Sequence, residues 1–474
     1  MHSVQIATLD GGNVVIESEK IDSLRASLRG QLFMKADETY DKLRKVWNGM
    51  IDRFPALIIQ CSGPSDVVKA VQFAEEYQLL LSVKCGGHNF GGLSVCDGGV
   101  MIDLSGMRSV RVDVVNKTAR AEGGALLSDL DKETQAFGLA TTSGTVSHTG
   151  IAGLTLGGGQ GWLMNKYGLT CDNLVSVDIV TADGQLRRAS KDENPDLFWA
   201  VRGGGGNFGV VTSFEYKLYS IGPLILGGLI IYPMEQAKKV LQFFREFSMN
   251  TPDELTLLAG LLCLPDGTPA LAVAAGWLGE LEEGKQVLKP LKEHGAPIAD
   301  MIGEIPYLQL QSIFDAAVAH GMPRYAKMGY LPQLSNDCID IVLNYWNNRT
   351  SPYSLVLLNT MKGAVTQIDP EQTPFFHRHA QWHFDIVSQW TDRADEEKHI
   401  NWVRNFWKDT ISFTNGASIN FLSGDDGNDR VRLSFGTNYD RLSEIKAKYD
   451  PDNFFRLNAN ILPKVKEKVA EATV

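Results

Sequence analysis

The sequence feature that most constrains this chain is a glycine-rich stretch around one histidine, Lys84-Cys85-Gly86-Gly87-His88-Asn89-Phe90-Gly91-Gly92. It follows an apolar run at residues 79–83, which predicts a buried strand that ends in a tight turn. Glycines let a backbone approach a ligand closely, direct successive N–H groups at negative oxygen atoms and adopt positive φ at little cost. We therefore expect a ligand-binding loop in which the imidazole of His88 coordinates, transfers a proton or forms a covalent bond. The alternative is a glycine-rich turn with an incidental histidine.

Two more glycine-dense stretches follow the first. The longer one runs from Ser143 to Trp162, and its glycines are interspersed with apolar residues such as Ile151 and Leu156. Each glycine in a helix costs about 1 kcal/mol relative to alanine. We therefore expect a backbone that lies flat against a large ligand rather than an ordinary helix, and a linker would not carry so many apolar side chains. The third stretch, residues 202–209, precedes a predicted strand at 210–216.

None of the three stretches has the pattern of a common nucleotide-binding loop. No Gly-Lys-Ser/Thr follows them, so a Walker A loop is excluded. They also lack the strand, G-x-G-x-x-G, helix and later acidic residue of a dinucleotide-binding Rossmann unit. A nicotinamide cofactor is therefore not expected.

Composition narrows the class of protein further. A formal net charge of -11 argues against a nucleic-acid binder, which needs a basic face. The six cysteines are scattered without a CxxC pair, which predicts reduced thiols and no zinc site. Because the sequence shows neither a signal peptide nor an apolar run of about 20 residues, we expect a cytoplasmic protein that does not enter a membrane.

The order of predicted elements indicates an α+β fold. A strand at 54–59, a helix capped by Ser65 and the strand before His88 form a β-α-β opening. The sequence pattern changes near residues 218–225. Glycine clusters precede this point, and predicted alternating strands and amphipathic helices follow it. The later predictions are strands at 100–104, 110–114, 175–181, 224–232, 270–278, 354–359 and 383–387, and helices from about 127 and at 234–249, 281–294, 396–408 and 442–449. Taken alone, Asn458 and Asn460 near the end read as surface turn residues.

Four ordered motifs together resemble one family. They are GGHNFGG at 86–92, SHTGIAGLTLGGGQGW with YGLTCDNL at 147–174, DLFWAVRGGGGNFGVVT at 196–212, and YDPDNFFRLNANI at 449–461. They are similar to the berberine-bridge-enzyme branch of the FAD-linked oxidases, within the vanillyl-alcohol-oxidase fold group. Among these, the bacterial 6-hydroxynicotine-oxidase-like members look most alike.

The resemblance implies a particular α+β architecture. A two-lobed FAD-binding domain of the vanillyl-alcohol-oxidase, or p-cresol-methylhydroxylase (PCMH), type would span residues 1–222 and receive the returning segment 421–474. Residues 223–420 would form a substrate-binding domain with a large antiparallel sheet backed by helices.

It also implies FAD attached once, through His88. Val146 stands where many relatives attach the flavin a second time through a cysteine, and Thr149 stands at the position that flanks the oxygen pocket. The remaining residues expected around FAD are Lys84, Cys85, Gly86, Gly87, Asn89, Gly91, Gly92, Thr145, Ser147, Gly150, Gly153, Gly157, Gly158, Gly161, Trp162, Gly209, Val211, Asn458 and Asn460.

For catalysis we expect Asp385, His148 and Gln160 to bound the reacting centre, without a metal ion. Alternation along residues 382–386 puts His383 and Asp385 on one face and Phe384 on the other, although Asp385 could instead face solvent on an edge strand. Lys327, Phe421 and His383 are the expected substrate contacts, whereas Arg324 is expected on the solvated surface. Gln160 and Phe421 replace tyrosines of plant relatives, which argues against a tyrosine base.

The function expected from this resemblance is oxidation of a carbon that bears OH or NH in a small polar metabolite, with O2 as the electron acceptor and H2O2 as the product. The protein would be a monomer or homodimer without nucleic-acid partners. Two alternatives remain open at this point: a dehydrogenase of the same fold with another acceptor, and a flavin-binding protein without turnover.

Overall fold

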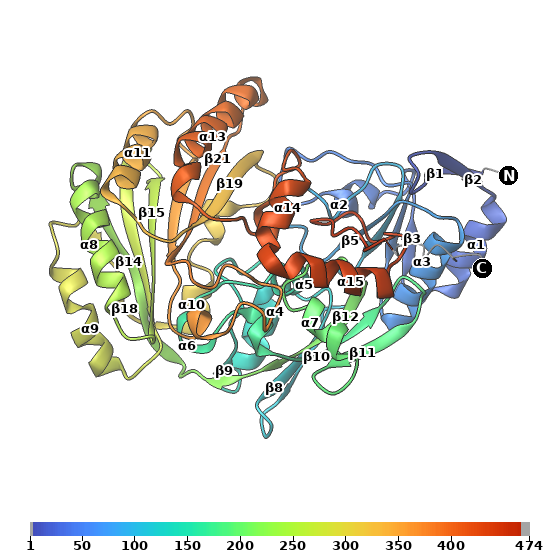
Figure 1. Cartoon of the computed structure of the whole chain (residues 1–474), viewed down its shortest axis with the longest axis horizontal. Coiled ribbons are helices and arrows are strands. Elements are labelled where there is room, and N and C mark those ends of the chain that lie inside the picture. The colour runs from blue at the N-terminus through green and yellow to red at the C-terminus, as the bar shows by residue number, and fades with distance from the viewer. Residues whose placement is uncertain (1–2, 466–474) are drawn as a thin grey trace, which may run out of the picture.

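The computed structural model describes residues 3–465, and its first lobe is built on a small mixed sheet (Figure 1). The strand order is β3-β4-β6-β5, with β4, β6 and β5 parallel and β3 antiparallel to β4. Helices α1 (Ser18–Ser27) and α3 (Pro64–Glu76) contribute apolar residues to the same core. The strands are β3 (Gln31–Phe33), β4 (Leu57–Gln60), β5 (Leu81–Lys84) and β6 (Val100–Asp103).

The start of α3 differs from the prediction. The helix begins at Pro64 and its N-cap is Gly63, without a side-chain cap, so the expectation that Ser65 caps it is wrong. Proline suits the first helical position because its fixed φ matches the helix and its missing N–H is not needed there. The carboxylate of Asp66 instead accepts hydrogen bonds from the amides of Arg29, Gly30 and Ser62, which ties this end of the helix to neighbouring loops.

The second lobe is an antiparallel five-stranded sheet in the order β11-β10-β12-β8-β7. Its apolar face shares one core with α4 (Leu127–Gln135), α7 (Pro195–Ala200), and with α14 (Asn428–Phe435) and α15 (Tyr439–Tyr449) from the end of the chain. Figure 1 shows α14 and α15, in red, beside these helices. The strands are β7 (Val110–Asp113), β8 (Thr118–Glu122), β10 (Leu174–Val180), β11 (Leu186–Ser190) and β12 (Val210–Lys217).

The second glycine-dense stretch contains a short helix, which corrects the expectation that it would be non-helical. Helix α5 (Ile151–Leu156) includes Gly153. A Cβ at Gly153 would meet nothing within 4 Å, so packing does not require a glycine there. Ile151 and Leu156 are buried in the core of the second lobe, and such tertiary packing outweighs the modest propensity cost of one glycine.

The largest sheet has eight strands in the order β17-β14-β16-β15-β20-β21-β19, with β18 paired to β14. Every pairing in it is antiparallel. Its outer face packs against α8 (Ala237–Met249), α9 (Leu281–Glu293), α11 (Asn336–Asn347) and α13 (Glu396–Thr410) in one core. The strands are β14 (Leu224–Pro233), β15 (Leu255–Cys263), β16 (Pro269–Trp277), β17 (Ala299–Asp300), β18 (Gly303–Pro306), β19 (Arg324–Leu331), β20 (Leu355–Thr360) and β21 (Trp382–Gln389).

This architecture confirms the predicted α+β class with a large antiparallel sheet backed by helices, as Figure 1 shows. Strands β15 and β19 and helix α11 were not predicted from the sequence. All six cysteines are free thiols, as expected. Within residues 3–465, the helices are too short or too polar to span a bilayer.

Candidate active site

A cavity of about 430 Å³ lies where the three glycine-rich stretches meet the inner face of the eight-stranded sheet. Residues from the first stretch, the second stretch, the sheet and the C-terminal return all contribute to its wall. The predicted site residues that line it are Cys85, Gly86, Gly87, His88, Asn89, Thr145, Val146, Thr149, Gly150, Gly153, Gly157, Gln160, Gly161, Trp162, Gly209, Val211, His383, Asp385, Phe421 and Asn458.

The glycine stretches pack so closely that side chains would not fit between them. A Cβ at Gly86 would lie 2.3 Å from the amide nitrogen of Gly150, and the reverse substitution would meet the same backbone. Gly87 has a φ of +68°, which favours glycine. Behind this contact, the amides of Leu127 and Ser128 at the start of α4 donate to the carbonyls of Thr149 and Ser147. The two loops therefore form one rigid wall made mainly of backbone.

Several residues predicted around FAD do not line the cavity. The Lys84 ammonium turns away to the Leu43 carbonyl and lies 3.6 Å from Asp103. Gly92 packs against Ile51, and Gly158 packs against the ring of Phe375. The others outside the lining are Gly91, Ser147 and Asn460.

Of the two C-terminal asparagines, one lines the cavity and the other does not. Asn458 lines the cavity and its Nδ2 donates to the carbonyl of Gly206 at 3.1 Å, which joins the end of the chain to the third glycine stretch. Asn458 is therefore not merely a residue of a surface turn. The Oδ1 atom of Asn460 is buried and has no hydrogen-bond partner among the described residues.

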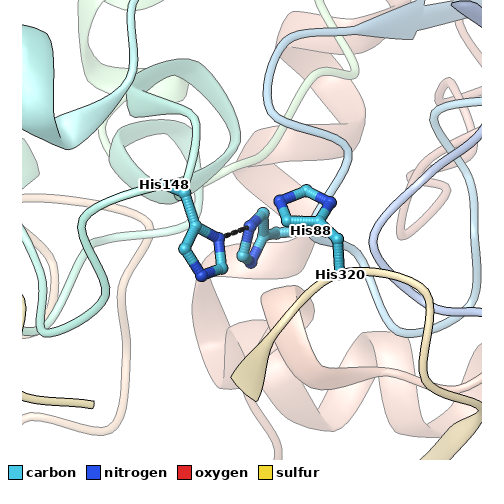
Figure 2. Close-up of side chains that lie close together, drawn as sticks. All are labelled: His88, His148 and His320. Carbon is cyan, nitrogen blue, oxygen red and sulfur yellow. Dashed lines mark hydrogen bonds between the residues drawn. The ribbon is translucent and has the colours of Figure 1, made fainter. Parts of the chain in front are cut away.

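His88 lies in a group of three imidazoles, shown in Figure 2. Its Nε2 lies 2.8 Å from Nδ1 of His148, and its ring stacks on Trp47 at a centroid distance of 4.8 Å. Burial, followed by the neighbouring rings of His148 and His320, holds the pKa of His88 well below its usual value. The imidazole is therefore neutral near pH 7 and has a lone pair for bonding.

His383 and Asp385 form the polar centre of the sheet side of the cavity. Strand β21 lies between β20 and β19, so Asp385 is not on an edge strand, and its exposed fraction is 2%. The predicted alternation is confirmed, because Phe384 packs into the helix-covered core while His383 and Asp385 line the cavity. Nδ1 of His383 lies 3.2 Å from Asp385 Oδ2.

This pair leaves two buried acceptor atoms. Nδ1 of His383 also lies 3.3 Å from Nδ2 of Asn359. In the tautomer in which Nδ1 donates to the carboxylate, which only accepts hydrogen bonds, the lone pair of His383 is on Nε2 and the Asn359 amide presents its oxygen to Nδ1. Neither Nε2 of His383 nor Oδ1 of Asp385 has a partner among the described residues. Buried polar atoms are ordinarily hydrogen-bonded, so both atoms are suited to receive a proton or hydrogen bond from a bound molecule.

The other predicted catalytic and substrate residues fall into two groups. Gln160 and Phe421 line the cavity, and Phe421 meets His383 edge to face at 5.0 Å. His148 lies behind His88 instead of in the wall. Lys327 pairs in register with Ile386 on the helix-covered face and forms ion pairs with Asp425 and Asp426. The structure therefore does not bring Lys327 to the cavity as the predicted substrate contact.

The expectation that Arg324 is solvated is wrong. Its exposed fraction is 1%, and its guanidinium carbon lies 3.6 Å from the centre of the Trp47 ring. Nε donates to Gln389 and the other nitrogens donate to the carbonyls of Trp47 and Ala319. Stacking and multiple hydrogen bonds make burial of an arginine tolerable. Arg324 thus holds Trp47 beneath His88.

Sequence reasoning missed several residues of the site. Trp47 appears in the sequence only as one member of an apolar series, and its stacking on His88 has no local signal. Asn359 and Gln389, by contrast, could have been predicted from strand alternation. Each lies on the cavity-facing side of its strand, and both line the cavity. His320 lies in a loop of no regular pattern and reaches His88 only through the fold.

The cavity suits a flavin dinucleotide. Its wall between residues 85 and 161 is glycine-rich backbone that offers amides to a pyrophosphate, and Gly86, Gly150 and Gly161 leave no room for side chains where the loops meet. The neutral nitrogen of His88 lies in the same cavity as the polar pair His383 and Asp385. The residues that would hold the group are those of the three glycine stretches and Asn458.

Comparisons with known proteins agree with this arrangement. Residues 55–190 match the family model described as FAD binding domain, and residues 417–462 match the one described as berberine and berberine like. An FAD-linked oxidoreductase of Dictyostelium discoideum is 34% identical over 92% of this chain and 95% of its own. The (R)-6-hydroxynicotine oxidase of Paenarthrobacter nicotinovorans is 31% identical over 92% and 97%.

Solved structures of oxidases are also similar to this chain. The 6-hydroxy-D-nicotine oxidase from Arthrobacter nicotinovorans has a TM-score of 0.85 at 29% identity, over 92% of this chain and 99% of that one. A chitooligosaccharide oxidase has a TM-score of 0.83 at 25% identity, over 94% and 100%. Fold and site define an FAD-linked oxidoreductase of the PCMH type. The chain belongs to the family of berberine-bridge-enzyme-like FAD-linked oxidases.

Proposed function

We propose that this chain carries FAD covalently on His88 and oxidises a small molecule at a carbon that bears OH or NH. The observation that carries the proposal is one cavity shared by the backbone wall around His88 and the buried pair His383 and Asp385. The named oxidases among the similar proteins support it. When bound, FAD supplies the acceptor for the hydride.

The chain's own residues would handle the proton. As a carbon loses hydride, the attached O–H or N–H becomes acidic and needs an acceptor within hydrogen-bond reach. Asp385 orients the His383 ring, and the two unpartnered atoms, His383 Nε2 and Asp385 Oδ1, are the acceptors. The sequence placed the base among Asp385, His148 and Gln160, and this proposal assigns it to the pair of Asp385 and His383. Phe421 and Gln160 would bound the substrate beside it.

The inner face of the sheet favours a substrate with an apolar body. Towards β14, β15 and β16 the lining is aliphatic or small, with Thr256 as its polar member, whereas the amide, imidazole and carboxylate side chains lie on β20 and β21. This pattern suits a ring system with one hydroxyl or amine directed at His383, and it argues against the polar metabolite expected from the sequence. The apolar group comprises Leu229, Leu258, Gly260, Leu262, Ala272 and Ala274, and the polar group Asn359, His383, Asp385 and Gln389.

Turnover is expected to release one H2O2 for each molecule oxidised, because small Thr149 leaves room for O2 near the proposed flavin site. A panel of aromatic alcohols, cyclic amines and oligosaccharides is screened by anaerobic flavin bleaching, and H2O2 is then measured with each compound that bleaches. Bleaching without H2O2, together with rapid reoxidation by a quinone or indophenol dye, would identify a dehydrogenase. A flavin that no compound bleaches, but that light reduces, would contradict the proposed turnover.

A further inference from the structure

Three separate segments bring three imidazoles together at the cavity wall, of which only that of His88 lines the cavity. His88 follows β5, His148 precedes α5, and His320 precedes β19 (Figure 2). Ring centroids lie 4.8 Å apart for His88 and His148, 4.8 Å for His148 and His320, and 5.3 Å for His88 and His320. The hydrogen bond between Nε2 of His88 and Nδ1 of His148, at 2.8 Å, singles out one pair within this group.

We propose that His148 accepts the proton that His88 must lose when it bonds to the flavin, and so promotes the attachment. The proposal rests on the proposed covalent link. His148 is outside the cavity lining, so it would act through His88 and not on substrate. A nucleophile hydrogen-bonded to a neighbouring base is a general arrangement for activating a weak nucleophile.

The chemistry of attachment requires such an acceptor. Overall, one C–H bond of the flavin 8α-methyl group and the N–H bond of His88 break, and one C–N bond forms. Two electrons remain on the flavin and pass to dioxygen, which together with two protons gives H2O2. Without loss of its N–H proton, the bonded ring of His88 would be a cation in a buried site beside Arg324, which burial disfavours. Transfer to His148 removes that charge from the reacting ring.

The surroundings keep His148 able to accept a proton. Burial lowers its pKa, and the Asp315 carboxylate opposes that effect, so the ring is neutral near pH 7 but can be stabilised when charged. Asp315 also holds the loop, because it accepts hydrogen bonds from the amide of Ser147 at 2.8 Å and from its hydroxyl at 2.6 Å. The other groups facing the cluster are Arg324, Lys84 and His320.

The test compares His148→Gln with the matched control His320→Gln in the full-length chain. Protein purified from riboflavin-limited cells is incubated with FAD, and covalent flavin is followed by its fluorescence on the acid-denatured chain. We expect His148→Gln to slow attachment about 10²–10⁴-fold while FAD still binds reversibly, and His320→Gln to stay within a few-fold of the parent. EDTA is present throughout, because three imidazole nitrogens within 4.8 Å of one another also suit a transition metal.

Two further readouts separate proton acceptance from packing. Because burial lowers the pKa of His148 below the ordinary imidazole value, the parent's attachment rate should fall only at acidic pH, where His148 becomes protonated, and His148→Gln should lose this dependence. Free imidazole should restore attachment in His148→Ala. If His148→Gln attaches flavin at the parent's rate, the proposal is wrong although the His88 link stands. A parent chain without any covalent flavin would overturn the proposed link itself, and this proposal with it.

Discussion

Replacing Asp385 with asparagine is expected to slow reduction of the flavin by substrate about 10²–10⁴-fold. The change keeps the shape of the side chain but removes the charge that orients His383 through the 3.2 Å contact. It also replaces Oδ1, one of the two unpartnered acceptors of the His383 and Asp385 pair. Stopped-flow absorbance under anaerobic conditions follows this step separately from reoxidation.

The pair should behave as a unit. His383→Gln is expected to cost a similar factor, and the double variant little more than either single variant, because groups that act together are not additive. His377→Gln is the matched control, since this histidine stacks on Tyr330 outside the cavity lining. If Asp385→Asn reduces the flavin at the parent's rate at every pH, the pair is not the base. The substrate proton would then pass to solvent.

The second large effect is on stability, at the buried pair Lys446 and Asp450. Both side chains are fully buried and 2.5 Å apart, and Lys446 also donates to the carbonyls of Asn207 and Phe455. Asp450 in turn accepts from the amides of Phe454 and Phe455. Lys446→Met leaves an unpaired buried carboxylate, which typically costs about 3–5 kcal/mol.

Chemical denaturation followed by tryptophan fluorescence measures this loss. Lys448→Met is the matched control, because Lys448 is mostly exposed and its ion pair with Asp196 lies near the surface. Such pairs contribute about 0–1 kcal/mol. A Lys446→Met variant as stable as the control would show that the C-terminal return does not depend on this pair.

The sequence predicted those parts of the site that depend on local pattern. Glycine density located the backbone wall, and period-two alternation placed His383 and Asp385 on one face of a strand. Alternation can place a side chain on a face only where a strand has been predicted. Strand β19, which carries Lys327, was not predicted. The sequence therefore did not indicate that Lys327 lies on the opposite face from Asp385, where Asp425 and Asp426 neutralise it.

Contacts between distant segments were beyond sequence reasoning. His148 was expected in the cavity as a base, but whether a loop side chain lies in a wall or behind it depends on packing against other segments. Trp47, Arg324 and His320 show the same limit, since each reaches the His88 region only through folding. The start of α3 was predicted two residues late because serine is a common N-cap, whereas the proline before it already suits the first turn.

The central claim is that His88 carries the flavin at the meeting point of three glycine-rich stretches. Trypsin cleaves after Lys84 and Arg108, so His88 lies on the peptide that spans residues 85–108. Mass spectrometry of the acid-denatured, digested chain should find the flavin on that peptide, and His88→Ala should abolish it. Flavin that acid releases completely, or that is found on the Cys171 peptide at residues 167–187, would contradict the account.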